Sequence, residues 1–354
     1  MHTSPLSICI IRISSMGDIV LVSPLLRQLR SRYPDAQIDM VVAERFTELV
    51  ENNPHLSAIH ALDTESGIFG ILRQSRQIRA SAPGGAGYDV VLDLHVNIRS
   101  WLLRQRLGRK VYCVDKFRQQ KQNLVRNKLG LGEAIVPVAE RYLRTASALD
   151  CRDDGGGLEL WLPEERGLAQ YPPDVEPSEH ASRTPLLRIA IAPGARHATK
   201  QWLPERFAAL AVSLNEKYGA EIVLLGGVDD QAVCDEVLRY CTIPVMNATG
   251  MRSVYETVRV LDGCDVLVCN DSGIMHIAAA RRIRVCAIFG STVREFGFAP
   301  FRVRHVIAET ALACRPCTHI GLPACPLGHL QCMHGVGTPD VLQAIEKELL
   351  TVHS

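Results

Sequence analysis

The sequence predicts an α/β protein with two doubly wound domains in tandem, and three observations support this. Short apolar segments alternate with segments of helical period along both halves of the chain, which indicates parallel sheets with helices on both faces. Residues 163–185 carry five prolines and almost no apolar period, so they mark a domain boundary. The length of 354 residues exceeds one ordinary core and fits two domains.

The first half of the chain opens with an apolar strand at 7–13 (SICIIRI). A helix follows and ends before Pro34, because its apolar residues recur at helical spacing. These residues are Ile19, Leu25, Leu26 and Leu29. Further strands are expected at 38–42, 88–94 and 111–114, and a helix is expected at 97–107.

The same alternation restarts in the second half of the chain. Strands are expected at 187–192, 221–225, 265–270 and 284–289, and helices at 204–218, 229–241, 253–263, 273–281 and 338–350. We therefore predict an N-terminal domain at 1–170, a linker at 171–185, a C-terminal domain at 186–337 and a final helical segment at 338–354. That last segment is expected to pack back toward the N-terminal domain.

Composition limits the classes of function. Apolar residues make up 47% and charged residues 22%, as in soluble globular proteins, and a net charge of +1 gives no general attraction to nucleic acid. The N-terminus lacks the layout of a secretory signal, and no apolar run reaches the roughly 18 residues that span a bilayer. We expect a cytoplasmic protein.

Polar residues follow the first strand in the loop SSMGD at 14–18. Gly17 allows a tight turn, and Asp18 lies in the first turn of the next helix. Asp18 is either a capping carboxylate favoured by the helix dipole or a general base that faces a cleft between the domains. Ligands of open α/β sheets bind beyond the carboxyl ends of the strands, where this loop lies.

A second loop, PGARHATKQW at 193–202, follows the first strand of the second half. Gly194 contributes to the turn. Arg196, His197 and Lys200 bring three candidate cations together, as a phosphate ligand would require. The alternative is a solvated surface loop.

Two more loops have the same position after a strand. Gly226 and Gly227 would let a ligand approach the backbone, although neither a G-x-G-x-x-G pattern nor a P-loop is present. The stretch VCNDSGIMH at 268–276 begins a helix, whose free N–H groups favour anions. Asp271 complicates a plain phosphate site, so diphosphate on the N–H groups with sugar hydroxyls on the carboxylate is one solution. The alternative is an ordinary helix cap with a buried His276.

Taken together, these motifs resemble those of glycosyltransferase family 9, the ADP-heptose:lipopolysaccharide heptosyltransferases, which have the GT-B fold of two Rossmann-like domains facing across a cleft. The matching segments span nearly the whole chain in order. They are IRISSMGDIVLVSPLLRQLR (11–30), PGARHATKQWLPERF (193–207), LLGGVDD (224–230), NATGMRSVYETVRVLDGCDVLVCNDSGIMHIAAA (247–280) and FGST (289–292).

The resemblance implies a role for each matched residue. Asp18 matches the catalytic base and Lys200 the lysine that meets the donor phosphates. The nucleotide-sugar site would comprise Gly194, Arg196, Lys200, Gly226, Gly227, Asp229, Asp271, Ser272, Gly273 and His276. Transfer would invert the anomeric carbon and need no metal, since Lys200 and helix N–H groups can neutralise the leaving diphosphate. Gln201 departs from the family, in which many members have a second basic residue there.

Residues 99–128 hold ten Lys or Arg and one acid, Asp115. We interpret this stretch as a patch for an anionic glycolipid acceptor and for peripheral contact with the inner face of the cytoplasmic membrane. The acceptor site would comprise Ser15, Gly17, Lys116, Arg118 and Lys121. A solvated helix face is the alternative. Nucleic acid is a weaker candidate because aromatic residues are only 5% of the chain.

The C-terminal part is rich in cysteine, with Cys314, Cys317, Cys325 and Cys332 in a loop at 314–332. The pattern allows structural zinc or reduced loop cysteines. No cofactor is expected for catalysis. Two other classes of function stay open at this point: a nucleotide-sugar epimerase of GT-B architecture and a non-catalytic sugar- or metal-binding protein.

Overall fold

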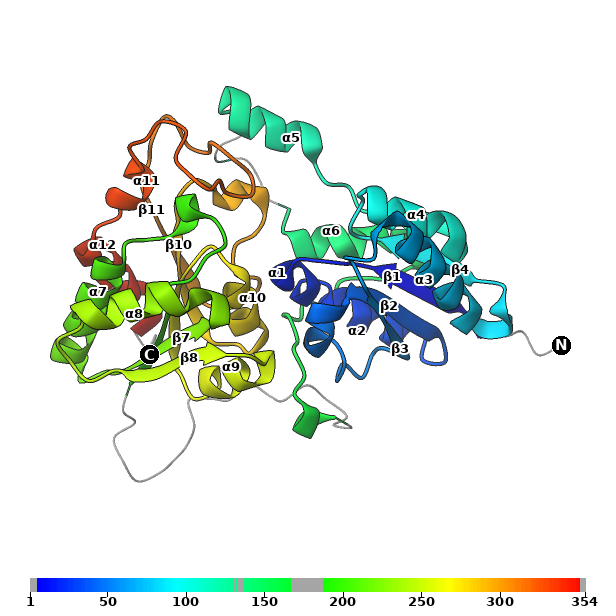
Figure 1. The fold of residues 1–354 in the computed structure, drawn as a ribbon, viewed down its shortest axis with the longest axis horizontal. Coiled ribbons are helices and arrows are strands. Elements are labelled where there is room, and N and C mark those ends of the chain that lie inside the picture. The colour runs from blue at the N-terminus through cyan, green and yellow to red at the C-terminus, as the bar shows by residue number, and fades with distance from the viewer. Residues whose placement is uncertain (1–4, 130–131, 133–135, 167–186, 351–354) are drawn as a thin grey trace. The chain divides into compact units, whose positions relative to one another are not determined.

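The computed structural model describes residues 5–129, 132, 136–166 and 187–350. Within them the chain forms two compact units (Figure 1), which are described in turn. The first unit holds residues 5–116 and 136–166, and the second holds 117–129, 132 and 187–350. The predicted linker at 171–185 and residues 351–354 of the predicted final segment lie outside the described residues.

The first unit is built on a parallel sheet in the order β3-β2-β1-β4-β5. Its central strand β1 is wholly buried because both faces of the sheet are covered. The strands are β1 (Ser7–Ile11), β2 (Gln37–Ala43), β3 (Ala58–Leu62), β4 (Tyr88–Asp93) and β5 (Gly108–Cys113). Strand β3 was not predicted, since its sequence AIHAL is short and only Leu62 is buried.

The helices of this unit explain why apolar residues fill both faces of β1. The helices are α1 (Met16–Val20), α2 (Ser23–Arg32), α3 (Gly67–Ser81), α4 (Ile98–Leu107) and α6 (Val138–Thr145). Short helical turns are η1 (Glu44–Leu49), η2 (Pro83–Gly85), η4 (Ser147–Leu149) and η5 (Pro163–Glu165). The predicted first helix is two helices, because Pro24 cannot continue an existing helix and instead opens α2.

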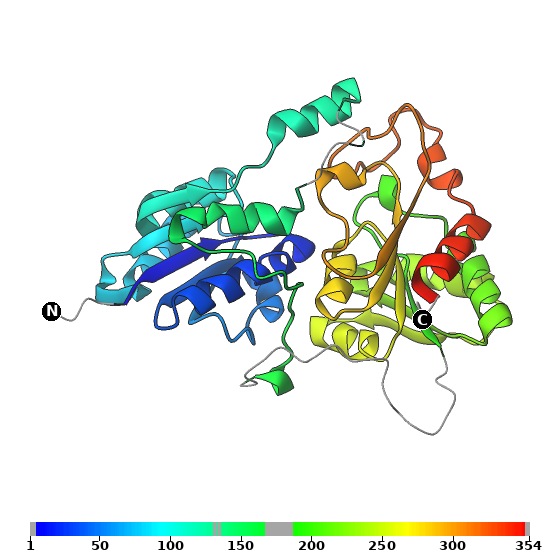
Figure 2. The same ribbon diagram turned by 180° about the vertical axis from the view of Figure 1, so that it is seen from behind.

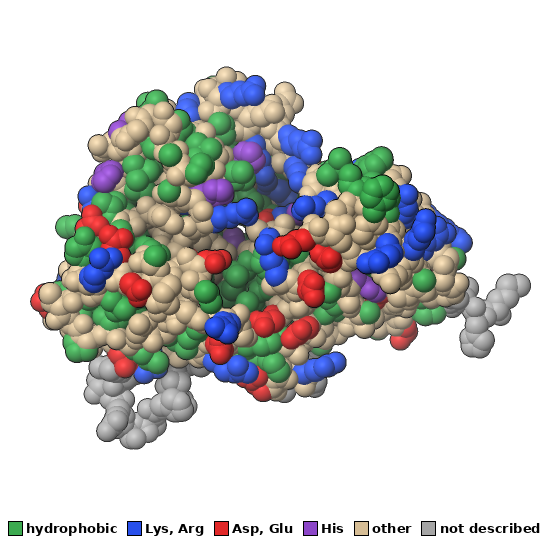
Figure 3. Space-filling view, in the orientation of Figure 1, with side chains coloured by type: hydrophobic (Ala, Val, Ile, Leu, Met, Phe, Trp, Pro, Cys, Tyr) green, Lys and Arg blue, Asp and Glu red, His purple; other side chains and the backbone are tan. Residues whose placement is uncertain are grey.

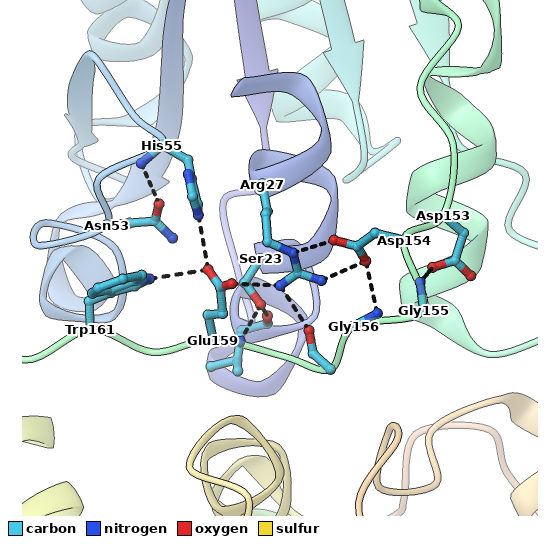
Figure 4. Close-up of polar contacts among 12 residues, drawn as sticks. Ser23, Arg27, Asn53, His55, Asp153, Asp154, Gly155, Gly156, Glu159 and Trp161 are labelled. Carbon is cyan, nitrogen blue, oxygen red and sulfur yellow. Dashed lines mark hydrogen bonds and ion pairs between the residues drawn. The ribbon is translucent and has the colours of Figure 1, made fainter. Parts of the chain in front are cut away.

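A partly buried polar network around Glu159 holds the segment after α6 against α2 (Figure 4). Arg27 on α2 contacts Glu159 at 2.6 Å and Asp154 at 2.7 Å, and His55 and Trp161 also hydrogen-bond to Glu159. Because the Glu159 carboxylate has a cation and several donors, its burial is compensated. The Glu159 N–H also donates to Ser23 Oγ at 2.8 Å, so this segment contacts the start of α2, directly after α1.

The second unit has a parallel sheet in the order β11-β10-β9-β6-β7-β8. Edge-to-face packing of Trp202 on Phe207, with ring centroids 4.9 Å apart, lies in its core. The strands are β6 (Arg188–Ala192), β7 (Glu221–Gly227), β8 (Met246–Met251), β9 (Val266–Asn270), β10 (Arg284–Phe289) and β11 (His305–Glu309). Two doubly wound α/β units confirm the predicted fold class.

Helices surround this second sheet in both ribbon views (Figures 1 and 2). They are α7 (Pro204–Tyr218), α8 (Gln231–Tyr240), α9 (Val254–Leu261), α10 (Gly273–Ala280), α11 (Gln331–His334) and α12 (Thr338–Ile345). Helical turns are η6 (Ala198–Lys200), η7 (Val228–Asp230), η8 (Arg294–Phe296) and η9 (Glu346–Leu350). None of the helices in the described part of the chain is long and apolar enough to cross a membrane.

Two segments differ from the predicted domain limits. Residues 117–129, with α5 (Arg118–Gln122) and η3 (Asn123–Asn127), belong to the second unit, since Leu124 is buried against Val293 and Phe296. Helix α12 places Val341 and Ile345 in the core of the second unit, where it packs on α7. Burial of apolar side chains decides both placements, and the expected packing of residues 338–354 toward the N-terminal domain stays a prediction.

Candidate functional site

In the first unit, β1 and β4 are neighbours, but the chain leaves them toward opposite edges of the sheet. Such a switch point opens a crevice at the carboxyl ends of the strands, where open α/β sheets bind ligands. Strand β1 leads there into the loop that ends at Asp18, and β4 leads into His95. Arg12 bridges the two strand ends because its Nη1 donates to the carbonyl oxygen of Leu94.

The Asp18 carboxylate is held by four donors at this point. Arg12 Nη2 lies 2.7 Å from Oδ1, and the hydroxyl of Tyr142 donates to the same oxygen at 3.3 Å. Ser15 donates to Oδ2 through its hydroxyl at 2.7 Å and its backbone N–H at 3.2 Å. Asp18 therefore caps α1, as one interpretation of the sequence proposed, while it also lies at the switch point.

Electrostatics keep Asp18 ionised. Burial raises the pKa of Asp18, but Arg12 and the hydrogen bonds from Ser15 outweigh burial, so the net pKa lies below its ordinary value. Burial also raises the pKa of Tyr142, which stays protonated as a donor. At neutral pH the site thus presents a carboxylate that can accept a proton.

His95 is a feature of this site that the sequence did not reveal. Buried Asp93 accepts hydrogen bonds from the backbone N–H groups of His95 (2.9 Å) and Val96 (2.8 Å), and Val96 has a φ of +47°. A β-branched residue is strained in that region, so the loop fixes His95 at an energetic cost. Burial, Arg12 and Lys116 lower the pKa of His95 to about 4, which leaves the ring neutral. Its buried Nδ1 has no hydrogen-bond partner among the described residues.

The second unit has its own switch point, between β6 and β9. Asn270 joins the loops that follow these strands: its Nδ2 donates to the carbonyl oxygen of Pro193 at 2.7 Å, and its Oδ1 accepts from the N–H of Trp202 at 3.0 Å. Both bonds are buried, so Asn270 sets the path of the 193–202 loop. From the sequence, Asn270 was predicted only as the last residue of the strand at 265–270.

Lys200 and Asp271 meet across this switch point. Lys200 Nζ lies 2.6 Å from Asp271 Oδ2, and Thr292 Oγ1 donates to the same oxygen at 2.6 Å. Thr292 follows β10, so loops after three strands converge here. The structure thus brings together two predicted site residues that are 71 positions apart in the sequence.

Helix α10 starts beside this pair. Ser272 is its N-cap residue, Gly273 is its first residue, and the buried Ser272 Oγ has no hydrogen-bond partner among the described residues. His276 is buried one turn further on, with its ring centroid 6.4 Å from that of Phe298. A buried hydroxyl beside a helix N-terminus and an ammonium group suits an anionic ligand.

The glycine loops lie on the neighbouring strand ends, because β7 pairs with β6. A side chain at Gly194 would collide with the carboxylate of Asp230, and one at Gly226 with the Cys234 sulfur. The Gly227 N–H donates to Asp230 at 3.2 Å, and burial raises the Asp230 pKa. Asp229, the acid favoured by the sequence, is exposed, whereas Asp230 faces the loop.

The remaining predicted cations of the 193–202 loop are more open. Arg196 is exposed, and burial together with Arg196 and Lys200 lowers the pKa of His197. The Cys-rich loop supports this segment from behind: the Thr199 N–H donates to the carbonyl oxygen of Leu322, and the Leu322 N–H donates back to Thr199 Oγ1 at 2.8 Å. The C-terminal loop therefore positions the residue next to Lys200.

The zinc expectation finds no support in the geometry. Within residues 5–129, 132, 136–166 and 187–350, no group of three or more Cys, His, Asp or Glu is placed to hold a metal ion. Cys332 is buried in the core with α11, whereas Cys314, Cys317 and Cys325 are half-buried. Burial raises the pKa of Cys332 and Cys317, so both thiols stay protonated at neutral pH.

The predicted acceptor residues are divided between the units. Ser15, Gly17 and Lys116 lie in the first unit, where Lys116 acts electrostatically on His95. Arg118 and Lys121 lie in the second unit, and Lys121 Nζ sits 5.7 Å from the ring centroid of Phe298. The basic stretch at 99–128 is thus not one surface of the first unit.

Comparison with known proteins decides the family. The model of glycosyltransferase family 9 (heptosyltransferase) matches residues 76–326, which is more than half of the chain. The chain belongs to glycosyltransferase family 9. It is 28% identical over 346 residues to lipooligosaccharide heptosyltransferase 2 of Campylobacter jejuni subsp. jejuni serotype O:2, with 96% of this chain and 97% of the relative covered.

Solved structures of family 9 show the same fold. The glycosyl transferase family 9 protein from Veillonella parvula superposes with a TM-score of 0.77 at 21% identity, with 99% of both chains covered. The E. coli ADP-heptose lps heptosyltransferase II superposes with a TM-score of 0.68 at 19% identity, with 98% of this chain and 99% of that chain covered. The predicted GT-B fold class is confirmed, and this family-9 chain is a glycosyltransferase of the heptosyltransferase type.

Proposed function

We propose that the chain transfers a heptose or a related sugar from an ADP-sugar to a lipopolysaccharide core or similar glycan, with inversion and without metal in the transfer step. The switch point around Lys200 and Asp271 carries this proposal. It combines an ammonium group, a carboxylate and an unsatisfied Ser272 hydroxyl at the start of α10. A diphosphate and the hydroxyls of a sugar need this set of donors and acceptors.

Donor binding would rearrange the Lys200–Asp271 pair. The diphosphate would compete with Asp271 for the Lys200 ammonium, while the Thr292 hydroxyl would still donate to Asp271. Asp271 would then accept hydrogen bonds from hydroxyls of the donor sugar. As charge develops on the leaving diphosphate, Lys200 and the α10 N–H groups would stabilise it. Asp230 and Asp229 are our candidates for the ribose hydroxyls, and Gly194 leaves room for the Asp230 carboxylate beside the loop.

We assign the attack step to the first unit. Asp18 would accept the proton of the acceptor hydroxyl, which must replace one of its four donors. Tyr142 is the longest of these contacts at 3.3 Å, so we infer that the acceptor displaces it. A second hydroxyl of the sugar acceptor would donate a hydrogen bond to Nδ1 of neutral His95, beside Ser15 and Gly17. We expect an anionic glycolipid acceptor, because Arg12 and Lys116 add positive charge at this edge.

The experiment is a transfer assay with ADP-heptose and core-truncated lipopolysaccharide, with and without EDTA. We expect a product one heptose heavier by mass spectrometry, inversion at the anomeric carbon by NMR, and an unchanged rate in EDTA. Conversion of the donor to an epimer in the absence of acceptor would contradict the proposal and favour epimerase chemistry.

A further inference from the structure

Helices α3 and α4 of the first unit pack against each other and expose an unusual set of apolar side chains. We name Ile68, Phe69, Ile98 and Trp101 the α3–α4 apolar patch. Phe69 is 87% exposed and Trp101 is 48% exposed. Other residues of these helices, such as Ile71 and Leu103, are buried in the hydrophobic core of the first unit. Single exposed apolar residues are common, but four on two adjacent helices mark an interaction surface.

The charged residues on the two helices have one sign, although the exposed acids Asp63 and Glu65 precede α3. Neither α3 (GIFGILRQSRQIRAS) nor α4 (IRSWLLRQRL) contains Asp or Glu. Exposed arginines are Arg73, Arg76 and Arg79 on α3 and Arg99 and Arg106 on α4. Phe69, Arg73 and Arg76 share one helix face because they are spaced four and three residues apart. Figure 3 shows hydrophobic side chains beside Lys and Arg over this region.

We propose that the α3–α4 apolar patch docks the enzyme on an anionic phospholipid surface. Aromatic and aliphatic side chains would enter the headgroup region, while the surrounding arginines meet lipid phosphates. A second copy of the chain fits less well, since two identical patches would bring arginines of like charge together.

The patch lies where a membrane-held acceptor would reach the first-unit site, an argument that rests on the proposed function. Helices α3 and α4 begin beyond the carboxyl ends of β3 and β4, at the edge of the sheet that also carries Asp18 and His95. A glycolipid held in a membrane would be presented at that edge. The basic stretch at 99–128 contributes Arg99 and Arg106 to this surface, but it does not form the surface as a whole. Arg104 pairs with buried Asp93, and Lys128 donates to backbone carbonyls of the second unit.

The test is flotation of the purified full-length protein with vesicles, without donor or acceptor, so its outcome does not depend on transfer. Vesicles of phosphatidylglycerol and phosphatidylethanolamine are compared with phosphatidylcholine. The test variants are F69S/W101S and R73Q/R76Q. The matched control is R239Q/Y240S on α8 of the second unit, where Tyr240 is 51% exposed and Arg239 is exposed.

We expect anionic vesicles to bind the wild type and the control equally. F69S/W101S should lower the affinity by at least about tenfold, and R73Q/R76Q by about fivefold for each arginine at low salt. Phosphatidylcholine vesicles should bind weakly. Equal binding by all four proteins, or equal loss in the control, would overturn the proposal. So would sedimentation that shows a wild-type dimer lost in F69S/W101S without vesicle binding, because the patch would then join two copies.

Discussion

The Arg12→Met substitution tests whether Arg12 lowers the pKa of Asp18 in the first unit. Arg12 and Asp18 form an ion pair at 2.7 Å, and their side chains are only 10% and 17% exposed. Burial raises the pKa of Asp18, and Arg12 is the strongest influence that lowers it. Methionine keeps much of the length of the side chain but removes the charge, so burial is no longer opposed by a cation and the pKa of Asp18 must rise.

The distance sets the size of the effect. At 2.7 Å and an effective dielectric constant of about 20, the attraction is about 6 kcal/mol. One pKa unit corresponds to about 1.4 kcal/mol, so this attraction sets a ceiling of about 4 units. Ser15 and Tyr142 still donate to the carboxylate, and water can enter the space left by the guanidinium group. We therefore expect a rise of about 1–3 units.

The assay is the pH dependence of kcat/KM for transfer. A carboxylate base must be ionised, so the rate falls as pH drops through its pKa. The wild-type acidic limb should lie below the ordinary Asp value, and that of Arg12→Met about 1–3 pH units higher. Arg30→Met is the control, since Arg30 donates to the carbonyl oxygens of Pro34 and Ala36 and makes no hydrogen bond to Asp18. Identical acidic limbs for the wild type and Arg12→Met would refute the reasoning.

Three further predictions follow from other parts of the structure. Lys200→Met should weaken ADP-sugar binding by about 10–100-fold in calorimetry, through loss of a charge-assisted hydrogen bond; unchanged affinity would argue against the donor site. His95→Ala should raise the acceptor KM about tenfold with donor affinity intact, as expected for one lost hydrogen bond; a loss of donor affinity instead would contradict it. Glu159, whose pKa is raised by burial but lowered overall by His55 and Arg27, stabilises the fold above its ordinary pKa, and this is lost as pH falls through the folded pKa. Glu159→Gln should therefore lower the free energy of unfolding by about 1–3 kcal/mol at neutral pH and flatten its acid dependence below about pH 5, as thermal unfolding would show.

The sequence predicted the parts of the fold that depend on local pattern. Apolar strands such as 187–192 and helices such as 204–218 were found because burial imposes a period on their own residues. Strands β3, β8 and β11 were missed, since most of their side chains are only partly buried or exposed and carry little pattern. Residues 117–129 were placed in the first domain because nothing local shows that Leu124 packs on Val293.

The candidate site divides in the same way. Lys200, Asp271 and Asp18 stand in strand-end motifs that a sequence displays directly. In the first unit, Asp18 is accompanied by His95 and Tyr142, and in the second unit Asp271 is accompanied by Thr292. Strand order and long-range packing place these three residues, and no local pattern encodes either. A weak signal for His95 was its position directly after the strand that ends in DL. The choice between Asp229 and Asp230 depended on which of two adjacent side chains turns inward.

The role of Asp18 is tested most directly by Asp18→Asn, a substitution that keeps the size of the side chain and removes its ability to accept a proton. Donor affinity by calorimetry and kcat for transfer are measured on the same preparation. We predict ADP-sugar affinity within about twofold of wild type and a kcat lower by about 10²–10⁴-fold. Transfer at the wild-type rate, or a loss of donor affinity as large as the loss of kcat, would contradict the account.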